Sequence, residues 1–194
     1  MGVSAKLALA STLSMVAAGL MIAPATGQPA SAEAAVTRDG QHDFDWEIGK
    51  WATNVRVLRN PLTGEAPDWV EFRGTSDVKR ILGGRANTVE LSVKNEKGAI
   101  EGIALRLYNP KARQWSLNYA TVGGGVMTAP VFGRFDGKGR GEFYGHDMLE
   151  GRAILVKFVI TQISPKEAKF EQYYSADGGK SWELNWLAVD TLQT

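Results

Sequence analysis

The feature that most constrains the fold is a series of short hydrophobic runs separated by brief polar turns. From residue 51 onward, each run is rich in β-branched and aromatic residues and ends near Gly, Pro, Asn or Asp. The turns are too short to hold the helices that connect parallel strands, so successive strands should be antiparallel neighbours. The runs cover residues 51–58, 69–82, 86–95, 103–109, 115–122, 129–135, 141–146, 154–163, 168–175 and 182–192.

These runs predict an all-β fold, an antiparallel up-and-down meander of about ten strands closed into a barrel, because closure removes exposed strand edges. Alternation along each run predicts which side chains face inward. A polar Gln172 between two aromatic residues on one such face is typical of a lined cavity. The predicted inward sets are Val89, Leu91 and Val93; Ile103, Leu105 and Leu107; Ile154, Val156, Phe158 and Ile160; Phe170, Gln172 and Tyr174; and Trp182, Leu184, Trp186 and Ala188.

Two motifs before the first run carry a resemblance. The pair Gly49-x-Trp51 resembles the opening of lipocalins and related calycin barrels, in which the tryptophan plugs the closed end. The string HDFDWEIGKW, residues 42–51, resembles the start of a family of uncharacterised exported bacterial proteins, a domain of unknown function. This resemblance implies a lipocalin/calycin-like barrel and assigns no activity. It continues through residues 107–110, Trp115, 141–144, 150–152, 171–172 and 175–182.

Residues 1–32 differ in composition from the rest of the chain. Lys6 precedes an apolar run from Leu7 to Ile22, and a Pro/Gly/Ala-rich stretch follows it. The run is shorter than the roughly 20 residues that span a bilayer, so we predict a cleaved signal peptide and no integral membrane anchor. Cleavage fits best after Ala32, with Ala25 as the second possibility. We therefore predict an exported protein, periplasmic or secreted, with residues 33–41 as a flexible segment and 42–194 as one β-barrel domain.

Composition excludes several classes of function. The chain has 22 Lys and Arg against 21 Asp and Glu, which gives no field that would attract nucleic acid. It has no cysteine and only two histidines, so disulfides, thiolate chemistry and a dedicated metal site are not expected. No cofactor motif is present, and we expect a monomer or a weak dimer.

Known catalytic patterns are also absent. There is no nucleophile elbow and no dinucleotide-binding glycine motif. The carboxylates at 43, 45 and 47, and those at 142, 147 and 150, are interpreted as solvated faces or turn caps. The stretch from Ser175 to Trp182 resembles an Asp-box hairpin, in which Asp177 would bind turn amides. We interpret it as structural, and no residue is assigned a catalytic role.

The remaining candidates are aromatic and polar residues in the runs. We predict that Trp186, Tyr119, Gln172 and Tyr174 contact a small, mainly apolar ligand inside the barrel. His146 is a fifth candidate near the mouth, where an inward ring could contact the ligand, act as a base or bind haem; an outward ring would lie in solvent. The predicted function is an exported small-molecule binding protein. The alternatives are a non-metal isomerase, cyclase or hydrolase with a Tyr/His/carboxylate site, and an envelope protein with a packed interior.

Overall fold

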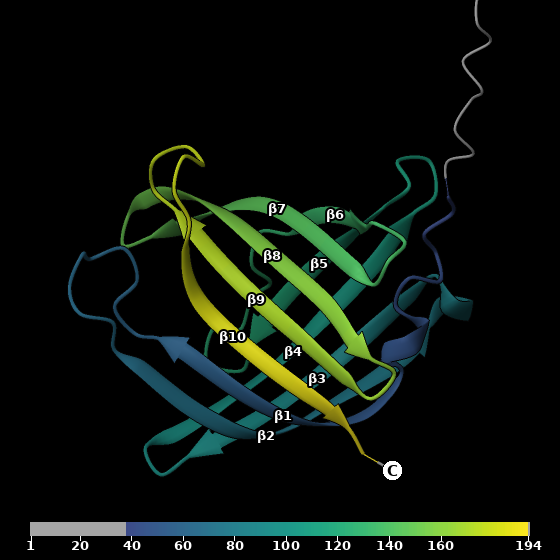
Figure 1. Ribbon diagram of the computed structural model, residues 1–194, viewed down its shortest axis with the longest axis horizontal. Helices are drawn as coiled ribbons and strands as arrows, with labels where there is room; N and C mark the ends of the chain where they lie inside the picture. The colour runs from purple at the N-terminus through teal and green to yellow at the C-terminus, as the bar shows by residue number, and fades with distance from the viewer. Residues whose placement is uncertain (1–37, 194) are drawn as a thin grey trace, which may run out of the picture. The chain divides into compact units, whose positions relative to one another are not determined.

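Ten antiparallel strands close into a barrel in the computed structural model, which describes residues 38–193 (Figure 1). Each strand pairs with its sequence neighbours, and the first pairs with the last, so the predicted meander and its closure are confirmed. The predicted signal peptide, residues 1–32, lies outside the described residues. The strands are β1 (Gly49–Leu58), β2 (Trp69–Ile81), β3 (Ala86–Asn95), β4 (Gly98–Asn109), β5 (Gln114–Thr121), β6 (Val131–Phe135), β7 (Arg140–Leu149), β8 (Arg152–Ser164), β9 (Glu167–Ser175) and β10 (Glu183–Leu192).

Short connections gather at the two ends of the barrel. The end where β1 begins carries the 3-10 helices η1 (Asp45–Glu47) and η2 (Leu82–Gly84), and we call it the closed end. The opposite end, which we call the open end, carries the longer loops 59–68, 122–130 and 176–182. Gly49 joins η1 to β1 with a φ of 140°, a backbone conformation that side-chain-bearing residues rarely adopt. This turn directs the N-terminal segment back across the closed end.

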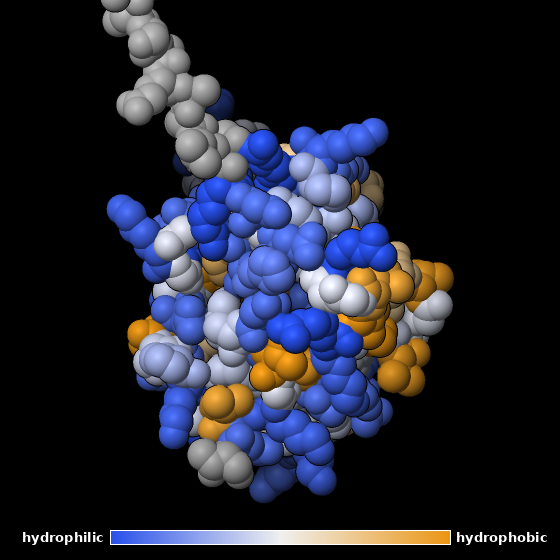
Figure 2. Space-filling model, turned by 90° about the vertical axis from the view of Figure 1, so that its right-hand side faces the viewer, coloured by the Kyte–Doolittle hydropathy of each residue, from blue (hydrophilic) through white to orange (hydrophobic). Residues whose placement is uncertain are grey.

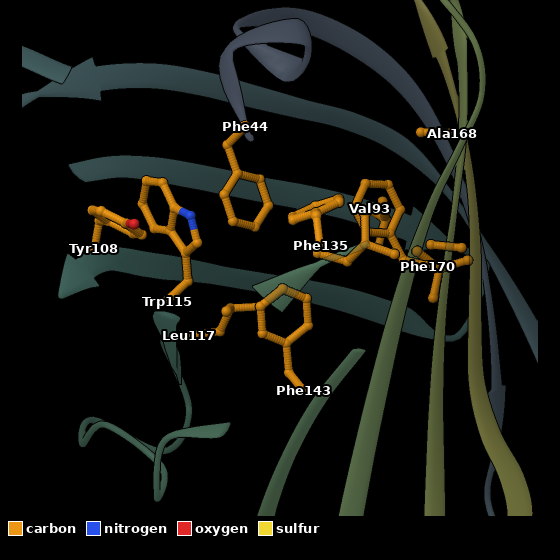
Figure 3. Close-up of a cluster of buried hydrophobic side chains, with 12 residues drawn as sticks. Phe44, Val93, Tyr108, Trp115, Leu117, Phe135, Phe143, Ala168 and Phe170 are labelled. Atoms are coloured by element: carbon orange, nitrogen blue, oxygen red, sulfur yellow. The ribbon is translucent and has the colours of Figure 1, made fainter. Parts of the chain in front are cut away.

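Aromatic packing fills the barrel beneath this segment. Trp51 is fully buried, and its indole Nε1 donates a hydrogen bond to the Glu47 backbone oxygen at 2.7 Å. Phe44 enters the barrel from the N-terminal segment, and its ring lies 4.9 Å from that of Trp115 and 5.0 Å from that of Phe135, both edge-on (Figure 3). Such edge-to-face pairs add to the stabilisation from apolar burial. The interior is therefore packed solid at the closed end.

Part of the segment predicted to be flexible also contacts the barrel. The Gly40 backbone N–H donates to the Tyr108 hydroxyl at 3.0 Å, and the Gly40 carbonyl accepts from Trp115 Nε1 at 2.9 Å. Arg38 forms an ion pair with the buried carboxylate of Asp43. Residues 38–41, the described part of that segment, thus contribute to the cover of the closed end.

The predicted alternation is correct on most strands and wrong on two. On β4, Leu107 is 37% exposed while Arg106 is 5% exposed, so the apolar set Ile103, Leu105 and Leu107 faces outward. Arg106 faces inward because it has a buried anionic partner, described below. On β10, an irregularity in pairing between Leu184 and Trp186 changes the alternation, and Leu184 pairs with the outward-facing Tyr173.

The face of the barrel that Figure 2 shows is mostly hydrophilic, with separate apolar patches. On β8, Val159 points outward yet is only 1% exposed, and its neighbours on the adjacent strands are Glu142 of β7 and Glu171 of β9. None of the helices within residues 38–193 has the length and apolar character needed to cross a membrane.

Candidate ligand cavity

A cavity of about 570 Å³ occupies the barrel above the packed closed end. This volume lies within the range of about 300–1,000 Å³ that is usual for small-molecule sites. Apart from Glu47 of η1, every lining residue outside the strands belongs to an open-end loop. The walls are mainly apolar and include Val55, Val57, Leu91, Leu117, Val156, Phe158, Phe170 and Trp186.

The floor of the cavity contains a buried ion pair. The Arg106 guanidinium donates two hydrogen bonds to the Glu47 carboxylate, at 2.5 and 3.0 Å, and the two side chains are 6% and 2% exposed. The guanidinium carbon also lies 4.4 Å from the centre of the Phe44 ring. A bidentate pair of this kind holds both groups in a fixed geometry. It joins η1 to β4 and therefore anchors the N-terminal segment across the barrel.

A third ionisable group, Asp190 of β10, completes the floor. The residue is buried, with only 4% of its surface exposed. Burial, together with the nearby negative charge of Glu47, raises the pKa of Asp190 from its usual 3.8 to about 7. Hydrogen bonds from the hydroxyls of Thr53 and Ser76, which lie 2.8 Å from each other, oppose this effect. A carboxyl group that titrates near neutral pH inside a cavity is a candidate functional group.

Polar side chains also line the upper part of the cavity. Gln172 Nε2 donates to the Tyr174 hydroxyl at 3.2 Å. Burial raises the pKa values of Tyr119 and Tyr174, so both phenols stay protonated at neutral pH. The β10 irregularity places Asn185 and Trp186 in the lining together. These groups can orient a ligand whose body contacts the apolar walls.

The loop between β5 and β6 borders the mouth. Val126, Thr128 and Ala129 of this loop line the cavity, and the Thr128 N–H donates to the Tyr119 carbonyl at 2.7 Å. Val126 is 71% exposed and the adjacent Met127 is 47% exposed. The mouth therefore has an apolar rim on this side, which suits the entry of an apolar molecule.

Of the five residues predicted from sequence, the structure brings four together. Trp186, Tyr119, Gln172 and Tyr174 all line the cavity. His146 does not: it is exposed on the outer face of β7 and is absent from the lining. The inward positions of β7 are Phe143, Gly145, Asp147 and Leu149, so strand alternation turns the His146 ring to solvent.

The sequence pattern did not reveal the floor of the cavity. The prediction that Glu47 and Asp43 belong to a solvated face is wrong, because both residues are buried. Arg106 was placed on the outer face and Asp190 was not singled out. Asp190 does carry a signal, since it lies two residues after Ala188 and two before Leu192, on the same face of the strand. A polar residue at an inward position of a strand is a cue for a site.

The Asp177 side chain accepts hydrogen bonds from the β9–β10 turn. Its Oδ1 accepts from the backbone N–H groups of Lys180 and Ser181, both at 3.0 Å, and its Oδ2 accepts from the Ser181 hydroxyl at 2.6 Å. These hydrogen bonds, led by those from Ser181, hold the pKa of Asp177 well below its usual value. No three His, Cys, Asp or Glu side chains within residues 38–193 lie close enough together to hold a metal ion.

Comparisons with known proteins add evidence on the fold. No protein-family model matches the chain, and no curated protein matches its sequence. Among solved structures, the chain is similar to the S-type phycobiliprotein lyase CPES from Guillardia theta, with a TM-score of 0.54 and 12% identity over 81% of this chain and 94% of that one. At this identity the likeness shows a shared barrel fold.

Two further structures match with lower TM-scores. The protein EF1p2_mFAP2b bound to DFHBI has a TM-score of 0.44 and 11% identity, over 79% of this chain and 99% of that one. A redesigned β-barrel has a TM-score of 0.41 and 11% identity, over 81% of this chain and 98% of that one.

Proposed function

We propose that this protein binds a small molecule with a mainly apolar body inside its barrel. The observation that carries the proposal is the cavity of about 570 Å³, with aliphatic and aromatic walls and a few converging polar groups. The similarity to a phycobiliprotein lyase is one of fold and is compatible with this function. We also propose that the protein is exported, as residues 1–32 predict, and that the ligand is met outside the cytoplasm.

Tryptophan fluorescence tests the binding proposal. Trp186 lines the cavity, so a bound molecule should change its emission or accept its energy. We expect N-phenyl-1-naphthylamine, a neutral apolar probe, to bind saturably with a change in tryptophan emission. Trp186→Phe should reduce that signal. Trp69→Phe is the matched control, because Trp69 lies outside this cavity, against Arg56 at 5.1 Å.

The binding proposal fails if no apolar probe, neutral or charged, gives a saturable change in the wild-type protein. It also fails if the two tryptophan variants lose the signal equally, because the probe would then bind the outer surface. A packed interior, the third possibility raised by the sequence, would give the first of these results.

One observation favours a second candidate function, proton transfer within the cavity. Burial raises the pKa of Asp190 to about 7, and a carboxyl group with such a pKa inside a cavity is suited to act as an acid or a base. The exposed His146 is outside this site, so a catalytic group would be the Asp190 carboxyl with the Tyr119 hydroxyl across the cavity. Turnover of an isomerisable compound that disappears in Asp190→Asn, while probe binding persists, would support this function over binding alone.

A further inference from the structure

Unpartnered polar atoms in the cavity indicate what chemistry a ligand must bring. Among residues 38–193, four buried atoms of lining residues have no hydrogen-bond partner: Asp190 Oδ1, Asn185 Oδ1, the Tyr119 hydroxyl oxygen and Arg106 Nε. The Asp190 and Asn185 oxygens can only accept hydrogen bonds, unless Asp190 is protonated. A buried acceptor without a donor is costly, so a ligand that supplies donors gains most.

Arg106 does not provide an opposing preference for an anion. Both terminal nitrogens of its guanidinium bind the Glu47 carboxylate, and its central carbon lies over the Phe44 ring, 4.4 Å from the ring centre. Its charge is therefore already neutralised within the floor. An anionic ligand group at this position would have to compete with Glu47 for both terminal nitrogens, and only the Nε–H would remain free to bind it.

The charges that line the cavity favour a cation. Three carboxyl groups, those of Glu47, Asp147 and Asp190, line it, whereas Arg106 is the one basic side chain among the lining residues. Once Glu47 and Arg106 are paired, an ionised Asp190 is an uncompensated negative charge in low-dielectric surroundings. A positive group beside Asp190 would remove that cost.

We infer that the ligand carries a protonated amine on its apolar body, and that the Asp190 carboxylate binds this amine at the floor of the cavity. The inference rests on the proposed binding function and adds the chemical class of the ligand. The apolar body would extend from Asp190 along the walls toward Trp186 and the open end. The Thr53 and Ser76 hydroxyls beside Asp190 favour its ionised form and so oppose part of the effect of burial.

Binding of an ammonium group requires Asp190 to lose its proton. Because its pKa is about 7, the affinity for an amine should fall roughly tenfold per pH unit once the pH is below this value. The other charged groups that face Asp190 are Glu47, from the segment before β1, and Arg106, from β4. These two groups form an ion pair with each other.

Displacement of N-phenyl-1-naphthylamine by three decyl compounds tests the inference at pH 7.5. Decylamine, 1-decanol and decanoate share one apolar body and differ in the charge of the head group. We expect decylamine to displace the probe at a concentration at least about tenfold lower than 1-decanol, because a charge-assisted hydrogen bond replaces a neutral one. Decanoate should be the weakest competitor. The advantage of decylamine should shrink between pH 7.5 and pH 5.5.

Two variants locate the amine. Asp190→Asn should bring the ratio of the decylamine and decanol affinities close to one. The control is Asp77→Asn, which removes one negative charge from the outer face of β2. Asp77 pairs with Lys79 outside the barrel, so this variant should retain the wild-type ratio. If Asp190→Asn fails to fold, the order of the three compounds and its pH dependence in the wild-type protein still decide the question.

Three results would overturn the inference while leaving the proposed function intact. The first is equal affinity for decylamine and decanol, or a preference for decanoate, with saturable binding of the probe. The second is an unchanged preference in Asp190→Asn. The third is loss of the preference in Asp147→Asn alone, which would place the amine at the mouth. Failure of the probe itself to bind would instead contradict the proposed function.

Discussion

The Glu47–Arg106 ion pair decides the orientation of a strand and the position of a helix. On β4 the charged Arg106 faces inward and the apolar Leu107 faces outward, which is the reverse of the usual arrangement. The inward arginine is tolerated because a carboxylate from η1 meets it with two hydrogen bonds. Desolvation offsets much of the attraction within a buried pair of this kind, so its net contribution to stability is small compared with the cost of removing one partner alone.

Removal of one partner should therefore cost more than removal of both. Arg106→Ala leaves the Glu47 carboxylate buried without a counter-charge, and we expect a loss of about 3–5 kcal/mol in the free energy of unfolding. Glu47→Leu combined with Arg106→Leu should recover a large part of this loss. Urea denaturation at pH 7 measures both. A double variant as unstable as Arg106→Ala would show that the pair contributes through packing rather than charge.

Asp190 gives stability a dependence on pH with a defined sign. Its pKa is raised from 3.8 to about 7, so the native state holds the proton more tightly than the unfolded state. The favourable contribution of the protonated group is complete below pH 3.8 and is lost as the pH rises to about 7. Above that pH, the wild-type protein carries an ionised carboxylate that burial disfavours.

Asp190→Asn should remove this dependence. Relative to the wild type, the variant should gain stability as the pH rises from 4 to 8, by a total on the order of 4 kcal/mol. Denaturation of both proteins across this pH range isolates the contribution of Asp190, because the other titrating groups are common to the two. A stability difference that stays constant with pH would contradict the raised pKa.

Strand β6 is the weakest part of the barrel. It has five residues and pairs with β5 over three residue pairs and with β7 over four. By contrast, β1 and β2 pair over ten residue pairs. The loop that borders the mouth connects β5 to β6, so the weak pairing and the entrance of the cavity are adjacent. Local opening at this place would admit a ligand without disturbing the closed end.

Amide hydrogen exchange should detect this opening. We expect the amides of residues 131–133 and of the preceding loop to exchange at least about tenfold faster than those in the middle of β3, because fewer hydrogen bonds and contacts must be broken. Saturation with a cavity ligand should slow the exchange of this loop. Protection of β6 equal to that of β3 would exclude the β5–β6 side as the entrance.

The two ends of the barrel have different roles. Trp51, Phe44 and the Glu47–Arg106 pair close one end, and the cavity reaches the loops of the other. A ligand can therefore enter from one side only, and its inner end must lie near Asp190. Because the two ends differ, the cavity has two environments. Near the mouth its apolar wall carries phenol and amide groups, and its floor is charged.

Export of the chain is a separate prediction, carried by residues 1–32. Protein recovered from the cell envelope or the medium should begin near Glu33, because Ala30 and Ala32 fit the signal peptidase. Replacement of both alanines with large residues should block this processing, whereas the same change at Ala23 and Ala25 should not. N-terminal sequencing distinguishes the two sites. Full-length protein in the cytoplasm would contradict the prediction.

Local pattern was sufficient for the architecture of this protein. Short runs and turns without room for crossover helices leave an antiparallel meander as the arrangement that pairs every strand. Alternation also placed Trp186, Tyr119, Gln172 and Tyr174 on inward faces, since a strand turns every second side chain to the same side.

The charged floor depended on contacts between residues far apart in the chain. Arg106 faces inward because Glu47, 59 positions away, pairs with it there, and no local pattern on β4 reveals that partner. Asp190 becomes unusual only once closure of the barrel removes it from water beside Thr53 and Ser76. The irregularity at Asn185 likewise arises from pairing with β9. Alternation along a strand reports which residues share a face, whereas burial and charge partners arise only when the strands meet across the barrel.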